Sequence, residues 1–137
     1  MPASIPTHLL LLALVFVGGG LGSVARYATT MAALRLLGAG FPWGTLTVNV
    51  VGSAVMGAFS GWLMSRAPGT GSDALRLFFM TGILGGFTTF SAYTLDTVAL
   101  WERGAPALAI LYAAASVVVS LAVLVAALLA TRAAFVS

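Results

Sequence analysis

The chain has 137 residues, of which 61% are hydrophobic and 7% are charged, far from the roughly 25% charged share of an ordinary soluble domain. Its formal charge of +3 comes from six arginines, with no lysine, against three acidic residues, and the scatter of the arginines along the chain disfavours nucleic-acid binding. Cysteine is absent and His8 is the only histidine, which excludes disulfides, thiolate metal sites and a cysteine nucleophile.

Four stretches without charge approach or exceed the ~20 apolar residues that cross the core of a bilayer. They are residues 9–25, 43–65, 77–95 and 104–131. We therefore predict an all-α membrane protein whose four transmembrane helices form a single domain over residues 1–137, with approximate spans 8–30, 43–65, 76–100 and 104–131. No Lys or Arg precedes residues 9–17, which disfavours a signal peptide there.

The first span is rich in glycine and ends near an arginine. Small residues let helix backbones approach closely, so Gly18 and Gly22 indicate helix packing. Arg26 has two interpretations: it reaches the interface or pairs with carbonyls, or it supplies positive potential at an anion entrance. Residues 31–41 continue the helix or lie at the interface, and Pro42 fits the start of the next helix.

The second span contains one amide side chain, Asn49. A buried Asn costs free energy unless it has a partner, so it forms an interhelical hydrogen bond or lines a pore as a donor. The nearby Thr45 and Thr47 favour the pore interpretation only slightly.

The third span is interrupted by two adjacent glycines, two threonines and a serine within residues 81–94. Non-helical backbone at membrane depth is tolerated only where protein or a water-filled cavity surrounds it. We therefore expect this helix to break mid-membrane near Gly85 and Gly86, at an ion or substrate path. Carbonyls ending the first half carry partial negative charge, and two copies meeting at a symmetry axis would form a cation site.

The second half of the broken helix offers groups to an anion. The amides and hydroxyls of Thr88, Thr89 and Ser91 would be available, and Phe90 and Tyr93, three residues apart, would stack on one face. Because ring edges are electropositive, two rings presented edge-on can line an anion path without a fixed charge. Such a pair alone is more often core packing, but the adjacent break favours the path.

In the last span, Tyr112, Ser116 and Ser120 recur every four residues and share one helix face. A lone serine in a helix usually bonds back to its own carbonyls. Three polar groups in one column instead indicate a hydrogen-bonding track or a polar interface, and the column ends at Leu124.

The charges give no orientation in the membrane. The arginines divide equally between the two ends of a four-span chain: Arg66, Arg76 and Arg132 against Arg26, Arg35 and Arg103. Either other features orient the chain, or copies insert both ways and pair antiparallel about an axis in the membrane plane.

Three motifs in this order resemble the fluoride channels of bacteria and archaea, the camphor-resistance CrcB family. They are Gly-Gly-Leu-Gly-Ser-x-x-Arg-Tyr at residues 19–27, Phe-Pro-x-Gly-Thr-Leu-x-Val-Asn at 41–49 and Gly-Gly-x-Thr-Thr-Phe-Ser at 85–91. With the serine column they cover nearly the whole chain. The resemblance implies an antiparallel dual-topology homodimer in the bacterial inner membrane, with two pores, a central sodium ion and passive fluoride export.

The resemblance also implies roles for individual residues. Asn49 would be the pore amide, Phe90 and Tyr93 the ring positions, and Tyr112, Ser116 and Ser120 the polar track. Backbone carbonyls of Gly85 and Thr88 would bind sodium, and Arg26 would lie near a pore vestibule. Three residues depart from the family pattern, where Phe, Glu and Thr are common: Tyr93, Asp96 and Leu124.

Two other functions compete with this prediction. A small dual-topology multidrug exporter normally needs a membrane-embedded carboxylate, and Asp96 is the only acidic candidate near a span. A non-transporting assembly protein would use the glycine patterns for packing only. An enzyme is disfavoured, because no His-Cys, Ser-His or paired-aspartate arrangement occurs at membrane depth. The expected partners are fluoride, a second copy and lipid, with no other protein partner evident.

Overall fold

The computed structural model describes residues 5–65 and 70–135, and every element among them is helical. In chain order they are α1 (Ile5–Leu37), α2 (Trp43–Met64), α3 (Thr70–Arg76), the π-helix η1 (Leu77–Leu84), α4 (Gly85–Phe87), α5 (Phe90–Glu102) and α6 (Pro106–Phe135). Arg66, one of the six arginines in the charge count, lies outside the described residues.

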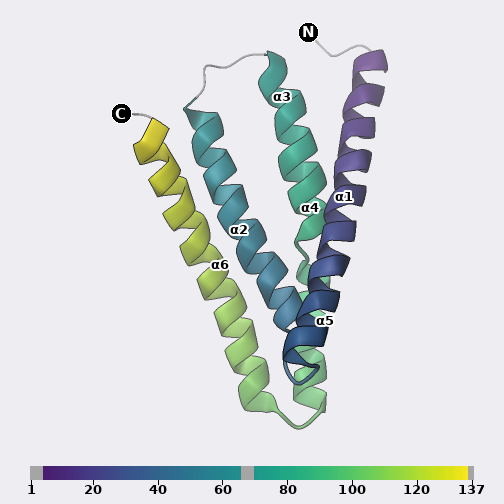
Figure 1. The fold of residues 1–137 in the computed structure, drawn as a ribbon, viewed down its shortest axis with the longest axis vertical. Coiled ribbons are helices and arrows are strands. Elements are labelled where there is room, and N and C mark those ends of the chain that lie inside the picture. Colours follow the sequence, from purple (N-terminus) through teal and green to yellow (C-terminus); the bar gives the residue numbers. More distant parts are fainter. Residues whose placement is uncertain (1–4, 66–69, 136–137) are drawn as a thin grey trace.

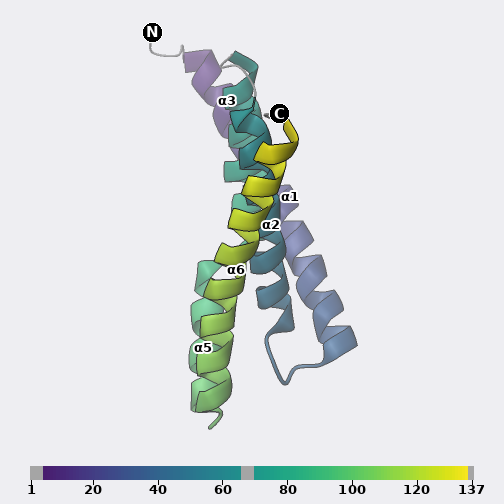
Figure 2. The same ribbon diagram turned by 90° about the vertical axis from the view of Figure 1, so that its left-hand side faces the viewer.

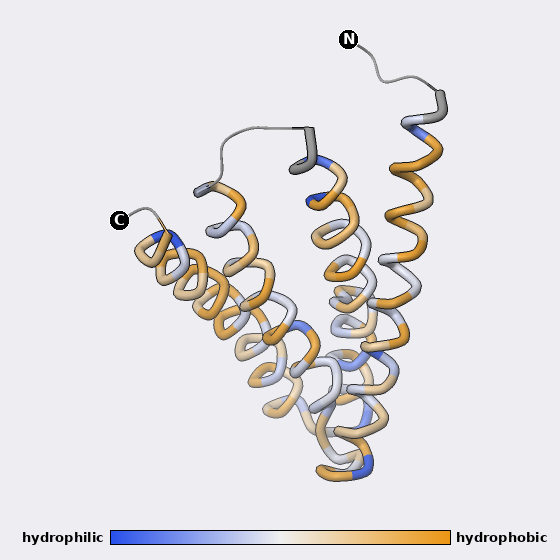
Figure 3. The backbone as a smooth tube through the Cα atoms, turned by 45° about the horizontal axis from the view of Figure 1, so that its top comes forward, coloured by the Kyte–Doolittle hydropathy of each residue, from blue (hydrophilic) through white to orange (hydrophobic). Residues whose placement is uncertain are grey.

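The structure contains four helical stretches that are long and apolar enough to cross a membrane, as predicted. They are Thr7–Leu37, Trp43–Met64, Asp73–Glu102 and Pro106–Phe135. Hydrophobic residues dominate along all four (Figure 3). The third stretch is composite, since it runs from α3 through η1 and α4 to α5.

The helices pack as two pairs joined through the centre. α6 packs along α2, and α1 packs along η1 and α4, while α5 lies against α6 (Figures 1 and 2). The start of α1 and the end of α6 lie at the same end of the molecule (Figure 1), as an even number of spans requires.

Glycines with positive φ end two of the helices. Gly38 follows α1 with φ +79°, and Gly104 follows α5 with φ +77°, a conformation that glycine adopts without steric cost. The helix therefore continues past residue 31 and stops at Leu37. Pro42 immediately precedes α2 and accepts a hydrogen bond from the Leu46 amide at 3.1 Å.

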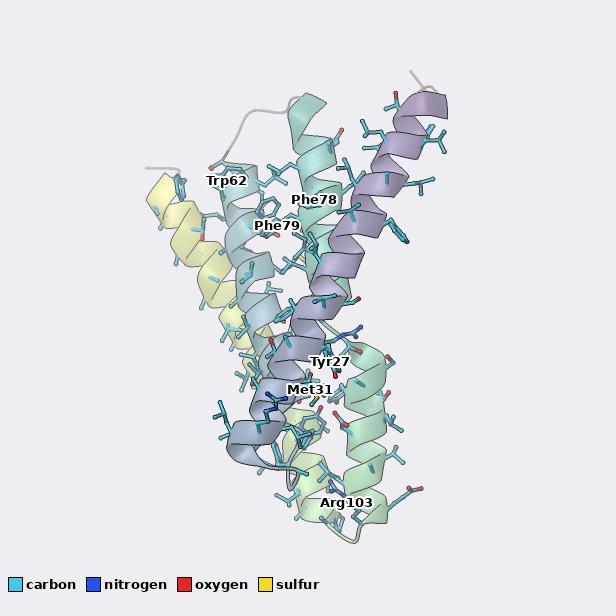
Figure 4. All side chains as sticks on the ribbon, turned by 45° about the vertical axis from the view of Figure 1, so that its right-hand side comes forward. Tyr27, Met31, Trp62, Phe78, Phe79 and Arg103 are labelled. Carbon is cyan, nitrogen blue, oxygen red and sulfur yellow. The ribbon has the colours of Figure 1, made fainter. Side chains whose placement is uncertain are left out.

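The glycines of α1 let its backbone touch the third span. A Cβ on Gly18 would lie 2.6 Å from the Phe78 carbonyl oxygen, and a Cβ on Gly22 would overlap the Ile83 carbonyl. The packing role predicted for these glycines is confirmed. On its other side, η1 places Phe79 near α2 and Trp62 (Figure 4), where its ring stacks on Phe59 with centroids 4.6 Å apart.

The backbone of the third span leaves the helical conformation at Thr88 and Thr89, whose φ/ψ values are −81°/158° and −153°/124°. Gly85 and Gly86, near which the break was expected, are themselves helical, and the extended residues follow them directly after Phe87. Thr89 is the N-cap of α5: its hydroxyl accepts a hydrogen bond from the Ala92 amide at 3.2 Å. A residue with extended dihedrals and a side-chain acceptor is well suited to start a helix, so Thr89 fixes where α5 begins.

Candidate functional site

Asn49 of α2 holds the extended segment through two hydrogen bonds. Its Nδ2 donates to the Thr89 carbonyl at 2.9 Å, and its Oδ1 accepts from the Thr89 amide at 2.8 Å. The amide thus satisfies a backbone donor and acceptor that the helix leaves unpaired at this point. Asn49 therefore positions the backbone between α4 and α5, and only its second N–H remains to donate elsewhere.

Beside these two hydrogen bonds lies a cavity of about 430 Å³ between α2, α5 and α6, which we call the central cavity. Its lining includes seven of the residues that the sequence singled out: Asn49, Thr88, Thr89, Phe90, Tyr93, Ser116 and Ser120. Among the residues that the structure describes, no charged side chain lines it. A wall of neutral amide and hydroxyl groups can bind a small anion or a polar solute weakly, without the strong hold of a fixed charge.

The two aromatic residues lie differently at the edge of this cavity. Phe90 is 75% exposed, whereas Tyr93 is half-buried. Their ring centroids are 5.4 Å apart at an interplanar angle of 40°. The Tyr93 hydroxyl donates to the Ala113 carbonyl at 3.4 Å, so it bonds to the neighbouring helix α6. Phe90 is therefore the ring that this chain leaves uncovered.

The column on α6 divides into two environments. Ser116 and Ser120 line the central cavity, and their buried hydroxyls have no hydrogen-bond partner among the described residues. Tyr112 does not line it: the side chain is completely buried, and its ring packs edge-on against Phe41 with centroids 5.5 Å apart. The structure thus brings the two serines together at the cavity and sets Tyr112 apart.

A second cavity of about 390 Å³, which we call the end cavity, lies beside the turn between α1 and α2. Its lining includes Thr45, Asp96 and Arg103, and Figure 4 shows Arg103 where α5 ends. Asp96 Oδ2 accepts hydrogen bonds from the Thr45 hydroxyl at 2.6 Å and from the Tyr112 hydroxyl at 3.4 Å. The ring of Tyr112 also packs against the ring of Tyr93, with centroids 5.6 Å apart, so Tyr112 links the walls of the two cavities.

Two further candidates line neither cavity. Ser91 is exposed, and its hydroxyl lies 3.3 Å from that of Thr89. Arg26 is half-buried in the middle of α1. Ser91 therefore contacts the site through Thr89, and Arg26 is separate from it.

Backbone carbonyls near the extended segment lack their helical partners. In a continuous helix the Gly85 and Thr88 carbonyls would accept from the Thr89 and Ala92 amides. Those amides donate instead to Asn49 Oδ1 and to the Thr89 hydroxyl. No group of three or more His, Cys, Asp or Glu side chains gathers in the described part of the chain. The oxygen atoms available to a cation near the end of α4 thus include the main-chain carbonyls of Gly85 and Thr88.

Two further residues of α2 that were not predicted from the sequence line the central cavity. Ser53 and Met56 line the central cavity one and two turns after Asn49. Their spacing of four and seven residues from Asn49 is the signal that could have found them, because it places all three on one helix face. The hydrogen bonds of Asp96 were not predicted either, because they depend on contacts between three different helices.

Comparisons with known proteins identify close relatives. A family profile described as CrcB-like protein, Camphor Resistance (CrcB), matches residues 13–128. A protein of Mesorhizobium japonicum named fluoride-specific ion channel FluC is 55% identical over 107 residues, covering 78% of this chain and 84% of the relative. FluC 2 of Nitrobacter hamburgensis is 52% identical over 119 residues, covering 87% and 94%, and FluC of Caulobacter vibrioides is 46% identical over 124 residues, covering 90% and 97%.

Proposed function

This chain belongs to the CrcB-like, camphor-resistance family, and on that premise we propose that it is a fluoride-specific ion channel. The family predicted from the three motifs is confirmed. Relatives about 50% identical over most of both chains carry the name of a fluoride-specific channel. With four helices able to span a membrane, the chain is a multi-pass bacterial membrane protein.

The observation that carries the mechanism is the central cavity, with its neutral hydrogen-bond donors and no fixed charge. Fluoride that enters the cavity loses a strongly held hydration shell. Several hydrogen-bond donors in a narrow passage are needed to replace the hydrogen bonds to water that the anion loses. Weak and multiple contacts then allow the anion both to enter and to leave. Hydrogen fluoride dissociates in the cytoplasm, and the fluoride anion that it releases is trapped there. The inside-negative membrane potential favours exit of this anion by about 2.3 kcal/mol per charge at 100 mV.

The multidrug-exporter alternative is not favoured. Such a transporter would need a carboxylate on its binding cavity, and the central cavity has none. Asp96, which lies within α5, accepts hydrogen bonds from Thr45 and Tyr112 beside the end cavity, where Arg103 also lies. An assembly protein is likewise not favoured, since the relatives are named as channels.

The main experiment on this function is fluoride efflux from liposomes that contain the purified protein, read with a fluoride electrode. A potassium gradient with valinomycin sets the potential, and chloride release is measured in parallel. We expect fast fluoride release without chloride release, because only the smaller anion fits a path of short-range donors. Absence of fluoride release from folded protein would contradict the proposal, and drug-proton antiport would then be assayed.

We further propose that two copies pair antiparallel, so that each completes the site of the other. Two observations support this arrangement. First, the arginines divide equally between the two ends of the helical bundle. Second, Phe90 at the edge of the central cavity is 75% exposed, so a second copy could cover its ring.

Dual insertion can be tested with single cysteines, because the natural chain has none. Ala107 and Ala134 are exposed near opposite ends of α6. In intact spheroplasts, a membrane-impermeant maleimide should label about half of the Ala107→Cys copies and about half of the Ala134→Cys copies. Complete labelling of one variant and none of the other would show a single orientation. Permeabilised cells, in which both should label fully, are the control.

The family also implies a bound sodium ion, and the residues present suit it. The Gly85 and Thr88 carbonyls have lost their helical donors and lie at the end of α4, where partial negative charge accumulates. We propose that these carbonyls from both copies hold the ion. Bound there, sodium would supply positive charge that stabilises the meeting of the two helix ends.

A further inference from the structure

The donors on the central cavity are largely engaged before any anion arrives. Asn49 Nδ2 already donates to the Thr89 carbonyl, and the Thr88 hydroxyl donates to the Leu84 carbonyl at 2.9 Å. The Tyr93 hydroxyl donates to Ala113 at 3.4 Å. A group whose proton is committed to a carbonyl must break that bond to donate to an anion, so these residues are poor first choices as fluoride donors.

Three serine hydroxyls on the cavity wall are uncommitted. Ser116 and Ser120 of α6 are buried without a partner, and Ser116 is only 5% exposed. Ser53 of α2 lines the same cavity and makes no side-chain hydrogen bond among the described residues. Hydroxyls in helices usually bond back to the carbonyl four residues earlier, as Thr97 and Thr131 do here at 2.8 Å. The cavity serines therefore keep their donors free.

The position of Ser53 makes the donor set two-sided. Ser116 and Ser120 belong to α6, whereas Ser53 and the remaining N–H of Asn49 belong to α2, one turn apart on the same face. A small anion that gives up its water needs donors on more than one side, because each hydrogen bond to a charged group replaces only one of those to water. Without Ser53, the α2 wall beyond Asn49 offers only Gly52 and Met56.

We propose that Ser53 contacts fluoride directly and, with Ser116 and Ser120, forms the set of hydroxyl donors that replaces the hydration shell of the anion. This inference rests on the proposed channel function. It assigns specificity to a residue of α2 in addition to the column on α6. Beyond it, Met56 and Leu124 make the wall apolar, so the hydroxyl set ends there.

The test compares Ser53→Ala with Ser60→Ala in the liposome efflux assay. Ser60 lies on the same helix, is half-buried like Ser53 and lines neither cavity. Loss of one donor to a charged partner should lower the fluoride efflux rate of Ser53→Ala by about tenfold or more, while Ser60→Ala stays within about twofold of the natural protein. That pattern, with unchanged elution on gel filtration, supports the assignment.

Two results would overturn it. One is a Ser53→Ala rate within about twofold of the natural protein, and the other is an equal loss in Ser60→Ala, which would trace the effect to helix packing. If Ser53→Ala does not yield folded protein, Ser53→Cys replaces it under the same thresholds, because a thiol has similar size but is a weak donor. Failure of the natural protein to release fluoride would instead reject the channel function itself.

Discussion

Replacing Asn49 by aspartate should reduce fluoride conduction by about a thousandfold. The substitution keeps the shape of the side chain but removes the Nδ2 donor that binds the Thr89 carbonyl at 2.9 Å. It also puts a fixed negative charge on a cavity that has none. At an effective dielectric constant of about 20, two like charges about 4 Å apart repel by about 4 kcal/mol, which corresponds to about three powers of ten in rate.

The matched control is Thr47→Val on the same helix. Thr47 lies two residues from Asn49, on another face of α2, and lines neither cavity. We expect this variant to conduct within about twofold of the natural protein, since valine keeps the shape of a half-buried side chain that lines neither cavity. Both variants are measured by fluoride efflux after gel filtration. An Asn49→Asp channel that conducts normally would mean that neither the amide nor the neutrality of the wall matters to conduction.

The two hydrogen bonds between Asn49 and Thr89 show which part of the site could be predicted from the sequence. The single amide of the second span is visible in the sequence, and its need for a partner follows from its burial. Its partner is not visible, because the register between α2 and the third span is set by packing between distant segments. The interhelical hydrogen bond predicted as one of the two interpretations of Asn49 is therefore present, and its partner is the backbone of Thr89.

The position of the extended segment is set by Thr89 and not by the two glycines before it. Glycine permits a helix to break, but Gly85 and Gly86 both keep the helical conformation. The residue that fixes the break is Thr89, through its hydroxyl on the Ala92 amide and its backbone on Asn49. A threonine before an aromatic helical segment is a recognisable N-cap, so this signal was available in the sequence.

Tyr112 illustrates the limit of helical spacing. It lies in register with Ser116 and Ser120, yet the ring is completely buried between Phe41 and Tyr93 and its hydroxyl reaches Asp96. A spacing of four residues predicts that side chains share one face of a helix. It does not predict that they have the same neighbours, because a second helix can cover only part of that face. Here α5 covers the start of α6 and leaves the serines on the cavity.

The same substitution, glycine to alanine, should have opposite effects at two positions of α1. At Gly22 an added Cβ would overlap the Ile83 carbonyl and lie 2.8 Å from the Phe87 amide nitrogen. These are backbone atoms of η1 and α4, which cannot rotate away as a side chain would. We expect Gly22→Ala to lower the midpoint of thermal unfolding in detergent by about 10 °C, the shift that corresponds to about 2 to 3 kcal/mol of overpacking.

At Gly20, two residues earlier on the same helix, an added Cβ meets no atom within 4 Å. Alanine is the better helix former by about 1 kcal/mol, so Gly20→Ala should leave the midpoint unchanged or raise it by a few degrees. The midpoint is followed by the loss of the monodisperse gel-filtration peak after stepwise heating. Equal midpoints for the two variants would mean that α1 can move away from η1 at little cost. A loss confined to Gly22→Ala would instead show that the close contact between the backbone of α1 and the backbone of η1 and α4 stabilises the fold just before the extended segment that Asn49 holds.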